Sequence, residues 1–280
     1  MEIKAIDVKK LREKTGAGML DCKKALQEAE GDFAKAEKIL KELGLAAAAK
    51  RSDRATKEGR IFGAVEGKTG ALLELTCETD FVAKNQDFIN YGEDMVKYVV
   101  DNNLEAMDAA LEGKVQAALS HIKENIVCKR FKCLTAADNE MLVHYIHGVG
   151  SIGVMVKLQA ADKAALDNDE VKAFAFDIAL HIAAFNPIYL DQSAVDPAYI
   201  KEQEEIFTTQ AANLGKPENV VAGIVKGKIN KHLSEICLLN QGFVKDEKQS
   251  VEAVMKQIGK NAGSDLRIAE YLYYKTGEEI

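Results

Sequence analysis

The chain of 280 residues is long enough for two domains, or for one domain with additions. It contains no apolar run near the roughly 18 residues that span a bilayer, and its first residues, MEIKAIDVKKL, lack the apolar core of a signal peptide. Its five cysteines are scattered, which predicts reduced thiols in the cytosol, and a net charge of −7 argues against broad binding to a phosphate backbone.

Residues 1–45 are predicted to form a compact module of three helices. Asp7 is placed to cap the first helix, the TGAG segment interrupts it, and MLDCKKALQEAE resumes as the second. Asp32 is placed to cap the third helix and Gly44 to end it. Residues 46–60 are basic at their centre and poor in large apolar side chains, which predicts a linker that stays partly helical.

Residues 61–140 are predicted to form a first unit of strands and helices. The segment IFGAVEGKTGALLELTC indicates two strands around a turn, and Thr79 and Asp80 are residue types that cap a helix start. The helix that they open is expected to run to about Val100. A pair of helices in LEAMDAALEGKVQAALSHIKENI and an extra strand in VCKRFKCL follow.

Residues 141–196 repeat this arrangement. The segment MLVHYIHGVGSIGVMVKLQA again predicts two strands around a glycine-containing turn, and the amphipathic helix DEVKAFAFDIALHIAAF follows until Asn186 and a proline end it. A shift of the chain by 81 residues places Gly67 on Gly148, with apolar residues on apolar residues beyond them. The sequence therefore predicts an α+β fold with a duplicated hairpin-plus-helix core.

Residues 197–236 are predicted to form an antiparallel helical hairpin. Two helical segments joined by GKP carry narrow apolar stripes, the first including Ile200, Phe207 and Leu214. Each stripe is too narrow to support a globular core, so the hairpin is expected to protrude. Residues 237–280 are expected to return to the core with a capped helix, SVEAVMKQIG, and a closing strand, LRIAEYLYYKTG.

The sequence offers little sign of catalytic or metal chemistry. His144 and His147 are three apart on a predicted strand and so face opposite sides, which disfavours a shared metal ion. Cys128 and Cys133 lack a second pair at zinc spacing. The EGKTGA segment has the wrong glycine spacing for a phosphate-binding loop and is predicted to be a hairpin turn. We expect no cofactor and no enzyme.

Phe81, within the segment ETDFVAKN, has two interpretations. On a single helix Phe81 shares its angle with Phe88, Met95 and Val99, so periodicity favours a core residue. The first turn can instead overhang the sheet, and the polar residues around Phe81 resemble the rim of an interface anchor. Composition leaves both interpretations open.

Four motifs in register resemble translation elongation factor Ts: LREKTGAGMLDCKKAL, ETDFVAKN, HGVGSIGVMV and HIAAFNP. The similarity runs the whole length and includes the GKP hairpin and the GFVKDEKQSVEAVMKQ segment. It implies a guanine nucleotide exchange factor for elongation factor Tu. The implied fold has an N-terminal three-helix ubiquitin-associated-like module, two related α+β subdomains, a protruding helical hairpin and a C-terminal module.

The resemblance also assigns partner-binding residues. The element that inserts near the GTPase's magnesium and phosphate site matches Thr79, Asp80, Phe81, Val82, Ala83, Lys84 and Asn85. The contact of the N-terminal module matches Leu11, Met19, Leu20 and Lys23, and that of the second subdomain matches His147. The family often has a second Met where this chain has Leu20, a near-isosteric change. The implied partner is elongation factor Tu in its GDP-bound and nucleotide-free forms, in the cytoplasm.

Two other classes of function stay open at this level. A helical adaptor would explain the projecting hairpin but leaves the ETDFVAKN corner without a role. An RNA-associated translation factor conflicts with the acidic balance, although AAAAKRSDR is locally basic. The resemblance also leaves open a homodimer through the helical hairpin, and we expect neither membrane association nor direct nucleic-acid binding.

Overall fold

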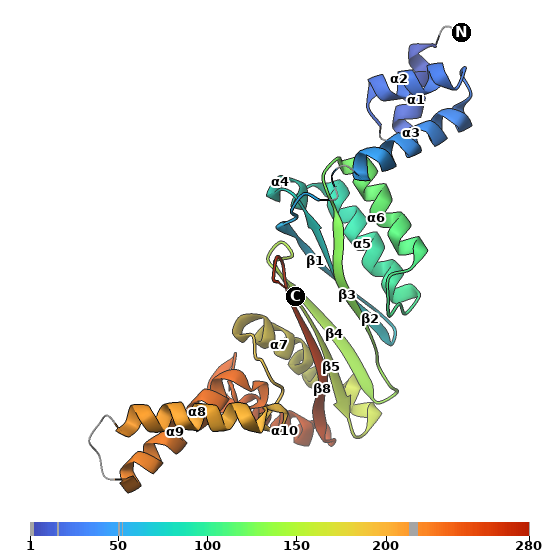
Figure 1. Cartoon of the computed structure of the whole chain (residues 1–280). Coiled ribbons are helices and arrows are strands. Elements are labelled where there is room, and N and C mark those ends of the chain that lie inside the picture. Colours follow the sequence, from blue (N-terminus) through green and yellow to red (C-terminus); the bar gives the residue numbers. More distant parts are fainter. Residues whose placement is uncertain (1–2, 16, 50, 52, 213–217, 280) are drawn as a thin grey trace.

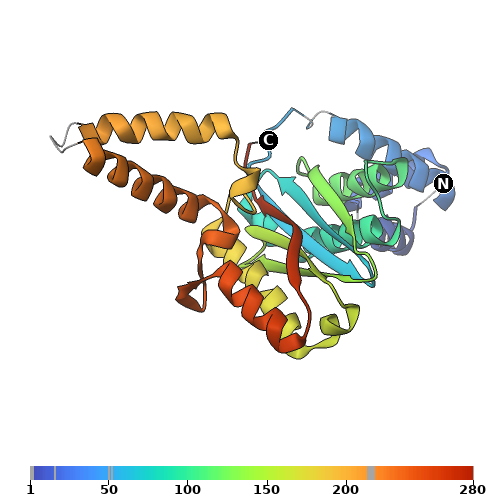
Figure 2. The same ribbon diagram turned by 90° about the horizontal axis from the view of Figure 1, so that it is seen from below.

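The computed structural model describes residues 3–15, 17–49, 51, 53–212 and 218–279. The molecule is elongated, with a small helical module at one end, a helical hairpin at the other and a mixed core between them (Figures 1 and 2). Within the described ranges, no helix is long and apolar enough to cross a membrane. The predicted GKP turn and Leu214 lie outside these ranges.

The N-terminal module packs three helices around a small apolar core that includes Val8, Leu11 and Leu26. Its helices are α1 (Ala5–Thr15), α2 (Met19–Glu28) and α3 (Phe33–Ala49). Asp32 accepts a hydrogen bond from the Lys35 backbone N–H at 3.0 Å, as expected of a cap. The assignment of Asp7 as a cap was wrong: α1 begins two residues earlier, and this carboxylate lies in its first turn, where it favours the helix dipole.

Gly44 does not end the third helix. Helix α3 continues through it into the alanine run, because alanine has the highest helix propensity and outweighs the roughly 1 kcal/mol cost of one internal glycine. Gly44 also has a packing reason: a Cβ atom there would lie 3.1 Å from the Ser120 hydroxyl of α6. The predicted linker at 46–60 is therefore shorter, since β1 already begins at Glu58.

The first half of the core is a three-stranded antiparallel sheet with helices on its outer face. The strand order is β1-β2-β3, and the β1–β2 hairpin turns at Gly67, as the glycine pattern predicts. Its elements are β1 (Glu58–Glu66), β2 (Thr69–Cys77), α4 (Asp80–Ala83), α5 (Gln86–Asp101), α6 (Ala109–Ile122) and β3 (Val127–Thr135). Only one helix, α6, forms where a pair was predicted. Asp108 caps it through the Leu111 N–H at 2.8 Å, and residues 102–106 before it lie in turns and bends.

The second half repeats this plan. Strand order is β4-β5-β8, again antiparallel, and α7 and α10 pack on the outer face. The elements are β4 (Glu140–His147), β5 (Ile152–Ala160), a 3-10 turn (Lys163–Asp167), α7 (Asp169–Phe185), β6 (Gly242–Phe243), β7 (Asp246–Ser250), α10 (Val251–Ala262) and β8 (Leu266–Lys275). Ser250 caps α10 and Asn186 ends α7 in a left-handed conformation, as the sequence predicts.

Each of the two sheets contains one irregularity in its strand register. The register of β2 with β3 shifts directly after the Glu74–Arg130 pair, and that of β5 with β8 shifts directly after the Lys157–Glu270 pair. Each sheet thus places an oppositely charged cross-strand pair beside its bulge, with the signs reversed. Under the 81-residue shift Glu74 falls on Met155, so the two bulges are similar in kind but do not occupy equivalent positions.

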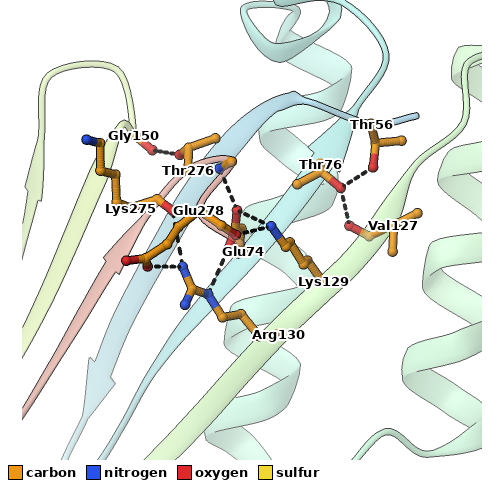
Figure 3. A network of polar contacts seen from close by, with 11 residues as sticks. Thr56, Glu74, Thr76, Val127, Lys129, Arg130, Gly150, Lys275, Thr276 and Glu278 are labelled. Atoms are coloured by element: carbon orange, nitrogen blue, oxygen red, sulfur yellow. Dashed lines mark hydrogen bonds and ion pairs between the residues drawn. The ribbon is translucent and has the colours of Figure 1, made fainter. Parts of the chain in front are cut away.

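The two sheets pack face to face, so the core has four layers: helices, sheet, sheet and helices (Figure 1). Leu72 and Met155 lie between the sheets, whereas Leu73 and Val154 point to the helices, because side chains alternate along a strand. Glu74, fully buried on the inner face, accepts a hydrogen bond from Arg130 and is surrounded by further polar groups from the end of the chain (Figure 3).

The predicted hairpin is present as two antiparallel helices that project from the core (Figures 1 and 2). Helices α8 (Pro197–Ala212) and α9 (Glu218–Ile236) pack along one apolar seam, and a 3-10 turn (Gln192–Ala194) and a second one (Leu238–Asn240) flank them. Phe207 and Val225 line this seam around the buried residues Ile229 and Leu233. The hairpin is therefore held by the narrow stripes that the sequence shows.

Candidate protein-interaction site

The segment between β2 and α5, here called the tip (Thr79–Asn85), departs from the single helix predicted there. Helix α4 covers only Asp80–Ala83 and stops at Lys84. Asn85 has extended dihedral angles and accepts a hydrogen bond from the Asp87 N–H at 2.7 Å, so it begins α5 as a new N-cap. The angular relation between the tip and α5 that periodicity assumes therefore does not exist.

Phe81 is exposed to solvent over 81% of its surface, the highest value among the large apolar side chains of the described residues. The core interpretation of this ring was wrong, because the helix is interrupted before Phe88. Its neighbour Ala83 is buried, so the assignment of Ala83 as a direct partner contact is corrected, and Val82 packs against the same apolar core of the first subdomain. The tip thus fixes its inner side in the core and presents the Phe81 ring outward.

Thr79 is the N-cap of α4. Its hydroxyl oxygen accepts a hydrogen bond from the Val82 N–H at 3.3 Å and donates one to Glu124 at 2.7 Å. The other carboxylate oxygen of Glu124 accepts the backbone N–H groups of Glu78 and Thr79, at 3.1 and 3.0 Å. No sequence signal linked Glu124 to the tip, since it lies 45 residues beyond Thr79 in the chain, in the bend that follows α6.

Glu78, at the base of the tip, accepts hydrogen bonds from the segment after α6 and from the segment before β1. Its carboxylate accepts the Asn125 N–H at 2.7 Å and an Arg54 guanidinium N–H at 3.3 Å. The Asn125 side chain in turn donates to the Arg54 carbonyl at 2.7 Å. The segment that leads from the N-terminal module is therefore fastened to the base of the tip.

Asp80 lies in the first turn of α4 and does not cap it. Its carboxylate pairs with Lys84 at 2.7 Å, one helical turn away, and this hydrogen bond is the main reason that the pKa of Asp80 lies below its usual value. Both side chains are about half exposed. They form a charged rim beside Phe81.

Cys77 precedes the tip at the end of β2. Burial, with a smaller contribution from the charge of Glu124, raises the pKa of its thiol to about 12. The thiol donates a hydrogen bond to the Thr79 carbonyl at 3.2 Å. A thiol in this state is a structural contact and a poor nucleophile.

The predicted contact residues of the N-terminal module divide into two groups. Met19, Leu20 and Lys23 are exposed on α2, Leu20 over 73% of its surface. Leu11 is fully buried in the module's own core, so its assignment as a direct contact is corrected: it packs against the residues behind that surface. A core residue of a three-helix module cannot also reach a partner without unpacking it.

His147 lies at the end of β4, exposed, with its Nδ1 atom 2.9 Å from the Tyr145 hydroxyl. The turn that follows exposes Val149 over 62% of its surface. This turn lies beside the start of β1, because the Ile61 N–H donates to the Gly150 carbonyl at 2.8 Å. The tip leaves β2 at the same end of that hairpin, so the tip and the His147 turn share one end of the core (Figure 1).

The described residues contain no group of three or more His, Cys, Asp or Glu side chains placed to hold a metal ion. What the tip offers is an apolar ring on a fixed mount with a polar rim, the geometry of an anchor in a protein–protein contact. An exposed anchor of this kind on an α+β core is typical of a factor that binds another macromolecule.

Comparisons with known proteins agree with this class. A model of the family described as elongation factor TS matches residues 78–278. Elongation factor Ts of Treponema denticola is 50% identical over 277 residues, which cover 99% of each chain. Elongation factor Ts of Borrelia hermsii is 44% identical over 278 residues, with 99% of this chain and 100% of the relative covered, and that of Borreliella burgdorferi is 46% identical over 272 residues, covering 97% and 98%.

The chain therefore belongs to the elongation factor Ts family, whose members are translation elongation factors that act in protein biosynthesis as nucleotide exchange factors. The resemblance inferred from the four sequence motifs is confirmed. The matched range of the family model begins at Glu78, the residue before the tip.

Proposed function

We propose that this chain accelerates GDP release from elongation factor Tu by inserting the Phe81 ring between elements of the GTPase that hold magnesium and the β-phosphate. The single observation that supports it is the exposure of Phe81 on a tip whose other side is buried. Magnesium offsets phosphate charge, so its displacement weakens the hold on GDP. No covalent chemistry by this chain is required.

Thermodynamic linkage gives the proposal its physical basis. An exchange factor that binds the nucleotide-free GTPase more tightly than the GDP-bound form must weaken GDP binding by the same factor. We propose that the tip provides this difference in affinity between the two forms of the GTPase, since its ring enters the partner only as the nucleotide site opens. Asp80 and Lys84 would line the rim of that contact, as would Thr79 and Asn85.

We assign the remaining contacts to two other surfaces. Met19, Leu20 and Lys23 on α2 form the first, which faces the same GTPase through the N-terminal module. His147 and the turn after it form the second. The exchange reaction is proposed to take place in the cytosol, and a homodimer through the α8–α9 hairpin stays a prediction to be tested by measuring the mass of the protein in solution.

The proposal is tested by the release of a fluorescent GDP analogue from elongation factor Tu, with and without this protein. We expect the wild-type protein to accelerate GDP release. The acceleration by Phe81→Ala should be about 30-fold smaller, since a buried aromatic anchor contributes about 2 kcal/mol or more. Ile188→Ala is the matched control, because Ile188 is also a highly exposed apolar residue but lies beyond α7.

Three outcomes would overturn the proposal. The first is no acceleration by the wild-type protein. The second is an equal loss in the two variants, which would deny Phe81 a special role. The third is unfolding of Phe81→Ala in circular dichroism, which would restore the core interpretation. Retention of RNA on a filter without any acceleration would favour an RNA-associated factor.

A further inference from the structure

Glu124 is joined to the tip by three hydrogen bonds that the proposed contact with the partner does not explain. Its two carboxylate oxygens accept the N–H groups of Glu78 and Thr79 and the hydroxyl of Thr79. These are charge-assisted bonds at 2.7 to 3.1 Å, the stronger class of hydrogen bond in proteins. One side chain therefore fixes both the backbone and the cap of α4.

The tip needs such a support because α4 is too short to stabilise itself. It has four residues, Asp80–Ala83. A single helical turn loses the conformational entropy of nucleation but gains very few hydrogen bonds in return. The Thr79 hydroxyl can accept from the Val82 N–H in a fixed direction because its own proton is directed at Glu124. The direction of the Phe81 side chain depends on this turn.

The position of Glu124 is in turn set by its own neighbours. Lys123, directly before it, adopts a left-handed conformation with φ of 65°, which turns the chain out of α6 and toward β2. The Arg51 guanidinium donates to the carbonyls of Leu119 and Lys123 at 2.9 and 3.1 Å, so it satisfies the C-terminal end of α6. Glu124 thus projects from a fastened helix end.

We propose that Glu124 is a positioning residue for nucleotide exchange: it holds the Thr79 cap and thereby keeps Phe81 in the outward orientation that enters the partner. This inference rests on the proposed function. Glu124 acts through the tip and does not itself contact the GTPase. Without Glu124 the tip samples several orientations. Insertion of the ring must then restrict the tip to one of them, which costs conformational entropy at that step.

The test is a double-mutant cycle in the fluorescent GDP release assay. Glu124→Ala is expected to lower the maximal rate of release about tenfold, the scale of one charge-assisted hydrogen bond, with little change in the concentration that gives half the maximal rate. The α2 surface and the His147 turn still make the first contact. In a Phe81→Ala background, Glu124→Ala is expected to have no further effect, since it acts through that ring.

A matched control and a milder variant accompany the cycle. Glu112→Ala removes an exposed carboxylate from α6, the helix that precedes Glu124, and is expected to leave exchange unchanged. Glu124→Gln keeps the shape but replaces one acceptor oxygen with a donor, so it should fall between wild type and Glu124→Ala. It also serves where Glu124→Ala does not fold. Because the chain has no Trp, Phe81→Trp introduces a single tryptophan, which can be excited selectively over the eight tyrosines. Its anisotropy should fall when Glu124→Ala is added.

Each result decides between the alternatives. Three results together support the inference. Glu124→Ala slows GDP release, it has no further effect in the Phe81→Ala background, and it makes the Trp at position 81 more mobile. Unchanged release in Glu124→Ala and Glu124→Gln overturns it, as does a full additional loss in the Phe81→Ala background, which would make Glu124 an independent contact. A wild-type protein that does not accelerate release would instead remove the proposed function.

Discussion

The Nε atom of Arg130 donates a hydrogen bond to the buried carboxylate of Glu74 at 2.7 Å, in the interior between the two sheets (Figure 3). The other oxygen of Glu74 accepts the Gly277 N–H at 2.9 Å, and Arg130 also donates to the Lys275 carbonyl at 3.1 Å and pairs with Glu278. The ion pair therefore joins β2 and β3 of the first half to the end of β8 in the second. The same end of the chain contacts the His147 turn, because the Thr276 hydroxyl donates to the Gly150 carbonyl at 2.9 Å.

We expect Glu74→Gln to destabilise the protein by about 3 kcal/mol, because it leaves the largely buried Arg130 charge with only the partly exposed Glu278 carboxylate as a counter-charge. Urea denaturation measures the change in the free energy of unfolding. Glu66→Gln removes a carboxylate that pairs with Lys97 on the surface, where both side chains are more than half exposed, and should have little effect. Equal effects of the two substitutions would contradict the role given to the buried pair.

Phe81 and Phe88 should respond oppositely to truncation. Phe81→Ala is expected to change the free energy of unfolding by less than about 0.5 kcal/mol, since the ring contributes little burial. Phe88→Ala should cost about 3–5 kcal/mol, because Phe88 is fully buried beside Phe62. Thermal and urea unfolding of both variants measure this difference. A large cost for Phe81→Ala would mean that the ring packs inside its own domain.

The glycines of the two helices on the first sheet should differ in the same way. A Cβ atom on Gly92 would lie 2.2 Å from the Phe62 ring, so Gly92→Ala should destabilise by about 1–3 kcal/mol through overpacking. Gly113 in α6 has open space around it, so Gly113→Ala should stabilise by up to about 1 kcal/mol through helix propensity. Unfolding midpoints measure both changes, and stabilisation by Gly92→Ala would refute the close packing of α5 on β1.

Stability should fall in mild acid because of His181. This imidazole is fully buried, with Nε2 2.9 Å from Gln241 Oε1 and Nδ1 accepting the Val244 N–H at 3.2 Å. Burial lowers its pKa from 6.5, although the Gln241 hydrogen bond opposes the shift, and burial likewise lowers the pKa of His144. The unfolded chain then binds protons more readily, so this contribution to stability is complete above pH 6.5 and is lost below it as the pH falls through the folded-state pKa.

Urea titrations at pH 7.5 and 5.5 measure this dependence. We expect a lower midpoint at the lower pH, and a smaller difference in His181→Gln, which keeps a polar side chain but does not titrate in this range. A midpoint that rises on acidification would contradict the assignment of a neutral buried imidazole that holds α7 to the C-terminal module.

Much of the fold could be predicted from the sequence because local patterns determine it. Gly67 and Gly148 mark hairpin turns with positive φ, and alternating residues around them define the inner and outer faces of each sheet. The ends of helices were less predictable. Glycine frequently ends a helix, yet α3 continues past Gly44, because Gly44 packs against Ser120 and a run of alanines follows it.

The exposed ring could be named from the ETDFVAKN motif, but its surroundings could not. Periodicity predicted one helix through Lys84, and only the cap chemistry of Asn85, followed by an acidic first turn, signalled a second start. Glu124 and Arg54 meet the tip through contacts far apart in the chain. Such contacts follow from how α6 and β3 are placed on the sheet, which no local pattern specifies.

Stiffness decides which of two bodies yields when they are pressed together. A loosely hinged aromatic side chain would fold back against its own sheet on meeting resistance, and the collision would leave the partner intact. The segment carrying Phe81 is braced at its base, and a second cap behind it starts a new helix. In the contact that we propose, the deformation would therefore fall on the partner and not on this segment.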